Sequence, residues 1–523
     1  MRALQHPAVV LLACLGVTLL AYGPSLSDGF YNDDALFLNH AGRVLEQPAR
    51  LLTERPLDYF RPTYGAFVTV QRAAFGLEPR GYHLVGVLLH ALTGLLVWRL
   101  ARLALKEPVP ALAAALVFVA FFSHSEGVLW IAAQNSVLAV CLCLGAVLCN
   151  LWAASRGGAG RALASAALVL LALCTKEPSA VLLAWLPLTE AVLCGPRRLL
   201  TGGALLRYGT VAAALALWLL GNARVGEAFL DEGATGTREL RATLGFVTLD
   251  GALGASAWLY SPLVHGDEQA HWWAGALALL GVLGVTALRR RDLLPAALLG
   301  VLLLLSAMVP ASMTRLQQIN SSRLYYFPTV GAALLAGVVM AWCTAHGAGA
   351  RAGASAGASA GSGGGALRWV GALALVAYLL VLTSAVRDLD RRDYAPVSRD
   401  QTRLAVQLGE RLGADAPRAV LLIEPWIDNP MHLAEFVQLY AGRAPERVGR
   451  QGIPRAEADA WLTRQRRLEP DVPVLDWSEA EGLVPATGAP VGNRDSAPGN
   501  PRREAELSAA SRFEVLRLEW RAR

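Results

Sequence analysis

Apolar residues in this chain gather in long runs that are separated by short polar connections. Many of these runs are about 17 to 23 residues long, which is the length that a helix needs to cross the ~30 Å hydrocarbon core of a membrane. The pattern predicts an all-α polytopic membrane protein with about 11 transmembrane helices. The predicted spans cover residues 7–22, 82–104, 109–123, 128–153, 162–176, 178–195, 204–221, 272–288, 293–313, 324–346 and 366–386.

Arginine placement predicts the orientation of these spans. No small-residue cleavage motif follows residues 7–22, so we expect an uncleaved first span with a cytoplasmic N-terminus rather than a signal peptide. Segment 246–264 contains an aspartate, two glycines and a late proline, and we expect an interfacial or re-entrant helix there rather than another crossing. Every strongly basic short connection then faces the cytoplasm. These connections contain Arg102 and Lys106, Arg156 and Arg161, Arg197 and Arg198, Arg289 to Arg291, and Arg351.

Composition supports a membrane protein and argues against two other classes. The chain is 54% hydrophobic and 17% charged, whereas soluble globular proteins carry about 25% charged residues. The net charge is +6, but only two of the 47 basic residues are lysines, and the arginines flank apolar runs, so we expect no nucleic-acid partner. The abundance of Arg, Ala and Gly is typical of a high-GC bacterium, so we expect the bacterial inner (plasma) membrane.

The region after the last predicted span has a different character. Residues 1–386 are predicted to form the membrane domain, with a flexible Gly/Ala/Ser-rich linker at 347–366 on the cytoplasmic side. Residues 387–523 contain charges of both signs and no cysteine, and an odd number of spans places them outside the cytoplasm. A strand at 418–423 and a helix at 430–439 predict a small extracytoplasmic α/β or mixed domain.

Two adjacent carboxylates stand out in the first outer loop, residues 25–80. Asp33 and Asp34 follow the first span closely, and like charges raise each other's proton affinity, so one of them is a candidate general base. The alternative is a solvated loop in which Asp34 caps a short helix. Arg61 follows in the same loop, where it is either a phosphate ligand or part of a membrane-surface anchor.

The next two outer connections are very short and contain ionisable side chains. His124 and Glu126 lie between two apolar runs, where we expect them to face the first outer loop, unless they belong to a solvated turn. Lys176 and Glu177 form either an ion pair that caps two helices or part of a site for an anionic lipid head group. His90, inside the second span, is expected to be a hydrogen-bonded packing residue.

The last outer connection introduces an arginine and a tyrosine at the mouth of a span. Arg323 and Tyr325 are candidates for holding a phosphate at the membrane surface, although snorkelling of the arginine is an alternative explanation. No dense carboxylate cluster demands a divalent metal. Asp33 and Asp34 together with Glu126 could still hold one.

In their order along the chain, these motifs resemble the GT-C class of polyprenyl-phosphate-dependent glycosyltransferases. The similarity is greatest to the protein O-mannosyltransferase and transmembrane-and-TPR mannosyltransferase group, and it covers roughly residues 1–345. The chain differs from the pattern of that group in three ways: Phe121 and Phe122 replace a usual His-Pro pair, Gln134-Asn135 replaces a usual basic residue, and no TPR repeat follows. The matching stretches are FYNDDALFLNH, DYFRPTYGAF, SHSEGVLWIAAQNSVLAV, CTKEPSAVLLAWLPLTEA and SSRLYYFPTVGAALLAG.

The resemblance implies an inverting glycosyltransferase, mannosyltransferase-like, that acts in the cell envelope or in protein glycosylation. Asp33, alone or with Asp34, would deprotonate an acceptor hydroxyl on a protein, lipid or polysaccharide, and the sugar donor would be a polyprenyl phosphate. His124, Glu126 and Glu177 would position the substrates, and Arg61, Lys176, Arg323 and Tyr325 would bind the lipid phosphate. Two alternatives remain: a transporter or flippase of a lipid-linked glycan, and a non-catalytic membrane scaffold.

Overall fold

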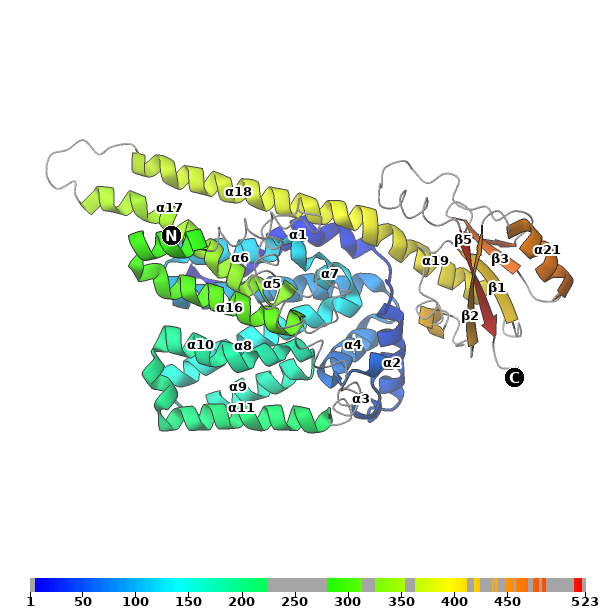
Figure 1. Ribbon diagram of the computed structural model, residues 1–523, viewed down its shortest axis with the longest axis horizontal. Helices are drawn as coiled ribbons and strands as arrows, with labels where there is room; N and C mark the ends of the chain where they lie inside the picture. Colours follow the sequence, from blue (N-terminus) through cyan, green and yellow to red (C-terminus); the bar gives the residue numbers. More distant parts are fainter. Residues whose placement is uncertain are drawn as a thin grey trace.

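The computed structural model describes residues 5–222, 280–312, 325–352 and 363–411 and several segments of the C-terminal region (Figure 1). The first part of the chain contains helices α1 (Pro7–Tyr22), α2 (Asp34–Glu46), α3 (Arg50–Thr53), α4 (Pro62–Phe75), α5 (Pro79–Leu105), α6 (Pro108–Ala120), α7 (Ser125–Leu129), α8 (Gln134–Arg156), α9 (Ala159–Leu173), α10 (Leu182–Cys194) and α11 (Gly202–Gly221). The later part contains α16 (Leu294–Ser312), α17 (Thr329–Ala352), α18 (Gly363–Leu389), α19 (Ala395–Arg411) and α21 (Ala458–Leu468). The strands are β1 (Arg418–Ile423), β2 (Arg447–Pro454), β3 (Val474–Ser478), β4 (Gly482–Pro485) and β5 (Arg512–Glu519).

The helices confirm a polytopic membrane protein. Six described helices are long and apolar enough to cross a membrane, or seven if α6 and the bent segment after it (Phe122–Leu129) form one broken span. Each predicted span overlaps a described helix, and α1 has the predicted bounds. The count of about 11 crossings stays a prediction, and segment 246–264 lies outside the described residues.

The bundle buries large aromatic side chains and leaves leucines on its outer surface. Tyr22, Trp98 and Trp185 are almost completely buried in the core between helices. Leu12 on α1 and Leu205 on α11 are 67% and 79% exposed. Apolar side chains on the outside of an apolar helix are the pattern of a surface that faces lipid.

A buried ion pair connects three of these helices. The carboxylate of Glu190 on α10 accepts hydrogen bonds from Arg207 and Tyr208 of α11 and from Asn150 of α8. Glu190 is 0% exposed and Arg207 only 5%. A charge pair at this depth is stable only when its polar atoms are well hydrogen-bonded, so this network holds α8, α10 and α11 together.

The first outer loop is mostly helical and packs on the bundle. Between α1 and α5 it forms α2, α3 and α4, and its aromatic side chains form a small core of their own. Phe37 of α2 lies edge-on to Tyr64 of α4 with ring centroids 5.2 Å apart. The Tyr64 hydroxyl donates to the carbonyl oxygen of Ile131 at 2.9 Å, which anchors the loop to the turn before α8.

One long helical run joins the bundle to the C-terminal domain. Helix α18 passes through a π-helical turn (Asp390–Tyr394) into α19, and Figure 1 shows this rod extending from the bundle towards the sheet. The predicted domain boundary at residue 387 therefore falls inside a helix. The predicted linker at 347–366 is also partly helical, because α17 continues to Ala352 and α18 begins at Gly363.

The described strands of the C-terminal region form one mixed sheet. It has five strands in the order β2-β5-β1-β3-β4. Strands β1 and β3 are parallel, whereas β5 pairs antiparallel with both β1 and β2. Strand β1 occupies the predicted residues 418–423, where an apolar run favours a strand buried inside a sheet. That residues 387–523 form a small mixed domain outside the cytoplasm stays a prediction, and most of the predicted helix at 430–439 lies outside the described residues.

Candidate active site

The two adjacent aspartates at the start of α2 have different environments. Asp34 is 1% exposed, and its two carboxylate oxygens accept the backbone N–H groups of Tyr31 at 2.7 Å and Ala132 at 2.6 Å. Asp34 therefore fastens the first outer loop to the turn before α8. Burial raises the pKa of the Asp34 carboxyl group well above its ordinary value, against the lowering effect of these two hydrogen bonds.

Asp33 precedes α2 and is half-buried, so part of its side chain reaches solvent. Its side chain makes no capping hydrogen bond to the helix. Asn32, just before it, has a left-handed backbone with φ of +46°, which turns the chain sharply into the helix. The expected alternative, in which Asp34 caps the helix from the preceding position, is not what forms: Asp34 is the first residue of α2.

Helix α19 packs against this turn and forms hydrogen bonds with it. The N–H of Asn32 donates to Gln401 Oε1 at 2.9 Å, and Gln401 Nε2 donates back to Asn32 Oδ1 at 3.0 Å. The N–H of Gly29 donates to Ser398 Oγ at 3.2 Å. The left-handed turn beside Asp33 is therefore held from the far end of the chain.

Tyr31 lies at the centre of an aromatic group beside the aspartates. Its ring is edge-on to Trp130 at 5.6 Å and tilted against Tyr394 at 5.2 Å, and Trp130 Nε1 donates to its carbonyl oxygen at 3.0 Å. Burial raises the pKa of Tyr31 to about 12, and the negative charges of Glu126 and Asp393 act in the same direction. Glu126 therefore lies close enough to Tyr31 to act on it electrostatically, and its predicted role stays a prediction.

Arg61 and Glu177 form a two-pronged ion pair. Arg61 Nε and Nη2 donate to the two carboxylate oxygens of Glu177 at 3.0 and 2.5 Å, and the guanidinium group lies 3.9 Å from the centre of the Tyr59 ring. The N–H of Thr63 also donates to the carbonyl oxygen of Cys174 at 3.1 Å. This pair joins the first outer loop to the connection between α9 and α10.

Lys176 does not pair with Glu177 as one alternative predicted. Its side chain is 7% exposed and its Nζ donates to Ser136 Oγ, 2.5 Å away near the start of α8. The backbone before Glu177 is extended, so the two side chains leave the chain in different directions. The Lys176 side chain is thus buried inside the protein against the start of α8.

His124 lies in the bundle core, which corrects the expectation that it faces the first outer loop. It is 0% exposed and its Nε2 lies 2.7 Å from Thr329 Oγ1. Its ring packs on Phe118 and Tyr326 with centroids 4.6 and 4.1 Å away. The chain bends inward after α6, which carries His124 away from solvent. His90 lies in the same group, hydrogen-bonded to Tyr326 and Val119, and its predicted packing role is confirmed.

The predicted phosphate ligands near α17 are only partly described. Tyr325 is 5% exposed, so it lies buried beside α17 rather than open at the membrane surface. Arg323 lies outside the described residues. In the part of the chain that the structure describes, no three His, Cys, Asp or Glu side chains gather into a group that could hold a metal ion. Asp34 also uses both oxygens for backbone N–H groups, which suits it poorly to a metal site.

Comparison with known proteins gives structural likenesses. No protein-family model matches the chain, and no curated protein matches it. ArnT from Cupriavidus metallidurans is 16% identical with a TM-score of 0.47, over 97% of each chain. An oligosaccharyltransferase from Archaeoglobus fulgidus is 14% identical with a TM-score of 0.45, over 78% of this chain and 56% of that one.

Arabinosyltransferase EmbB from Mycobacterium smegmatis is 15% identical with a TM-score of 0.39, over 80% of this chain and 44% of that one. The chain thus spans about half the length of the oligosaccharyltransferase and less than half that of EmbB. These values mark a distant likeness of this chain to the three structures.

Proposed function

We propose that this protein is a membrane glycosyltransferase that moves a sugar from a polyprenyl-phosphate donor to an acceptor hydroxyl on the outer face of the membrane. The proposal rests first on the difference between the two aspartates. Asp34 is buried and fully used in holding the turn, whereas Asp33 is half-exposed at the start of α2. The order of the outer motifs, which resembles that of GT-C glycosyltransferases, supports the same activity.

In this mechanism Asp33 acts as the general base. Its carboxylate takes the proton of the acceptor hydroxyl while that oxygen attacks the anomeric carbon of the sugar. The bond between the anomeric carbon and the phosphate oxygen breaks, the configuration inverts, and polyprenyl phosphate leaves with the bonding electron pair. A base of this kind must reach both solvent and substrate, and partial exposure favours Asp33 over Asp34.

Positively charged side chains would stabilise the leaving phosphate. Negative charge grows on the phosphate in the transition state, and fixed cations lower the energy of that state. We assign this role to Arg61 and Arg323, with Lys176 adding a buried positive charge. Glu177 would hold the Arg61 guanidinium group in a fixed orientation through its two-pronged contact. Glu126, beside Tyr31, would orient the acceptor.

The choice of sugar and acceptor extends this proposal. We expect mannose or a related hexose, a protein, lipid or polysaccharide acceptor, and a bacterial inner membrane with the C-terminal region outside. A divalent ion is the remaining candidate cofactor, and the described residues do not themselves form a site for it.

The test is a transfer assay with the full-length chain in liposomes. Radiolabelled polyprenyl-phosphate sugars are incorporated one at a time, with and without a chelator, and label is followed into lipid, protein and water-soluble fractions. Transfer of label from at least one donor is the expected result. Movement of a fluorescent lipid-linked glycan across the bilayer without sugar transfer would instead support a flippase. The absence of both activities would support a non-catalytic scaffold.

A further inference from the structure

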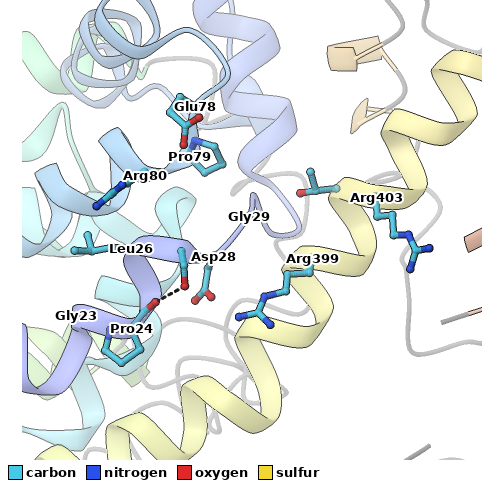
Figure 2. Close-up of a pocket in the computed structure, with 12 residues that line it drawn as sticks. Gly23, Pro24, Leu26, Asp28, Gly29, Glu78, Pro79, Arg80, Arg399 and Arg403 are labelled. Carbon is cyan, nitrogen blue, oxygen red and sulfur yellow. Dashed lines mark hydrogen bonds between the residues drawn. The ribbon is translucent and has the colours of Figure 1, made fainter. Parts of the chain in front are cut away.

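A cavity of about 830 Å³ lies between the end of α1, the start of α5 and α19 (Figure 2). Its size is within the range of about 300–1,000 Å³ that is typical of small-molecule sites. Neither Asp33 nor any residue assigned above to the donor phosphate lines it. The lining residues are Gly23, Pro24, Leu26, Ser27, Asp28, Gly29, Glu78, Pro79, Arg80, Arg399, Thr402 and Arg403.

Charged side chains from three segments line this cavity. Arg80 lies in the first turn of α5, and Arg399 and Arg403 lie one turn apart on α19; all three are exposed. Glu78 and Asp28 are the acids of the lining. Helix α5 begins at Pro79, so its N-terminus, the positive end of the helix dipole, adjoins the cavity.

Asp28 is the buried polar group of the lining. It is 5% exposed, and neither of its carboxylate oxygens accepts a hydrogen bond from a donor among the described residues. In Figure 2 its carboxyl group points towards the guanidinium group of Arg399. Burial and the neighbouring carboxyl group of Asp390 raise the pKa of Asp28 to about 8, against the opposing effect of Arg399.

The charge beside the cavity depends on Asp28 and on its neighbour Asp390. A neutral Asp28 does not repel an anion. The lining then carries three arginines against one acid, Glu78, so it is net positive and suits a ligand with anionic oxygens.

The depth of the cavity in the membrane indicates which kind of anionic ligand it binds. It opens where α1 ends and α5 begins, and both helices are candidate membrane spans, so it lies at the depth of lipid head groups. Gly23, Pro24 and Leu26 give its lining an apolar side. We propose that this cavity binds the phosphate of a lipid head group, with Arg80 and Arg399 donating to the phosphate oxygens.

The experiment measures lipid binding to the purified full-length protein in detergent by native mass spectrometry. Dioleoylphosphatidylglycerol is the probe, and dioleoylglycerol, which lacks the phosphate, is the matched lipid. The variant Arg80→Gln/Arg399→Gln should bind phosphatidylglycerol about tenfold or more weakly, because it loses two charge-assisted contacts. Arg466→Gln, which removes an exposed arginine of α21, is the control and should match the wild type. Thermal midpoints verify that all variants fold.

A pH series tests Asp28 separately from folding. Wild-type affinity for phosphatidylglycerol should fall between pH 7 and 9.5, because Asp28 ionises above its pKa of about 8 and then repels the phosphate. Asp28→Asn stays neutral and should show no such fall. The lipid phosphate is a diester that stays singly charged over this range. The other groups that face Asp28 are Asp390 of the π-helical turn, Arg399 and Arg403 of α19, and Glu78, Arg80 and His83 of α5.

Three outcomes would overturn the proposal. Equal phosphatidylglycerol affinity of the wild type and the Arg80→Gln/Arg399→Gln variant would remove the arginines from the site. Equal affinity for dioleoylglycerol would show that the phosphate is not recognised. Binding of inorganic phosphate alone, with no gain in affinity for the lipid, would identify free phosphate rather than a head group as the ligand.

Discussion

Two groups of carboxylates in this protein differ in how they are surrounded. In the network between α8, α10 and α11, Glu190 is completely buried and accepts hydrogen bonds from three side chains. In the turn before α2, Asp34 is buried and accepts two backbone N–H groups, yet the adjacent Asp33 keeps part of its surface open. The acid of the first group, Glu190, is buried, whereas the second group places the partly exposed Asp33 beside the buried Asp34.

The difference shows how a membrane protein can use the same side chain for architecture and for chemistry. A buried carboxylate surrounded by donors is fixed in place, because separating it from its partners would leave an uncompensated charge. An accessible carboxylate on a rigid neighbour can meet a substrate while keeping a defined position. Asp34 therefore holds the backbone of the turn from which we propose that Asp33 acts.

The largest expected effect is on catalysis by Asp33→Asn. Removing a general base should lower the transfer rate about 10²–10⁴-fold, with an unchanged thermal midpoint because the side chain is only half-buried. Glu46→Gln, an exposed acid at the other end of α2, is the matched control and should transfer at the wild-type rate. Steady-state transfer in liposomes measures both, and equal rates for the two variants would remove Asp33 from the mechanism.

The next effect is on stability, from Glu190→Gln. This change leaves Arg207 buried without its counter-charge and should lower the free energy of unfolding by about 3–5 kcal/mol. Denaturant unfolding in detergent gives the value. The apolar replacement Glu190→Leu/Arg207→Met should recover most of the loss. Loss of transfer activity in Glu190→Gln without loss of stability would contradict the structural role and would indicate that Glu190 acts on a substrate.

Asp34→Ala should combine both kinds of effect at a smaller energetic cost. It leaves the N–H groups of Tyr31 and Ala132 without their acceptor, which should destabilise the fold by about 2–5 kcal/mol. The turn that positions Asp33 loosens, so transfer should fall too. Asp33→Ala is the comparison variant and should keep the wild-type stability. Wild-type unfolding behaviour of Asp34→Ala would show that these two hydrogen bonds do not hold the turn.

The smallest effect concerns the ion pair between Arg61 and Glu177. The side chains are 13% and 33% exposed, so solvent weakens their attraction and the coupling should be about 0.5–1.5 kcal/mol. A double-mutant cycle with Arg61→Gln and Glu177→Gln measures it from unfolding free energies. Additive effects of the two changes would mean that the pair contributes nothing to stability.

The local pattern of the sequence predicts the helices and one strand well. Helix α1 and strand β1 have the predicted bounds because a long apolar run and a short apolar run each favour one structure. The two aspartates lie at the start of α2, and their predicted position outside the cytoplasm stays a prediction. These predictions succeed because they depend on neighbouring residues.

The local pattern of the sequence does not predict contacts between segments that are distant along the chain. His124 is buried because Phe118, Thr329 and Tyr326 close around it, and two of these come from about 200 residues away, as the separation of 205 between His124 and Thr329 shows. Ser398 and Gln401 hold the aspartate turn from 369 residues away. The helical pattern of 395–411, continuous with the last span, is the one signal that could have indicated α19 as part of the site.

The central claim, that adjacent aspartates have separate roles, is tested most directly by measuring transfer rate and thermal midpoint together for Asp33→Asn and Asp34→Asn. Both variants and the wild type are purified and reconstituted in parallel with the donor that the wild type uses. We expect Asp33→Asn to lose transfer activity but to keep the thermal midpoint of the wild type. We expect Asp34→Asn to have a lower thermal midpoint than the wild type. A lower midpoint for Asp33→Asn, or full transfer by it, would contradict the account.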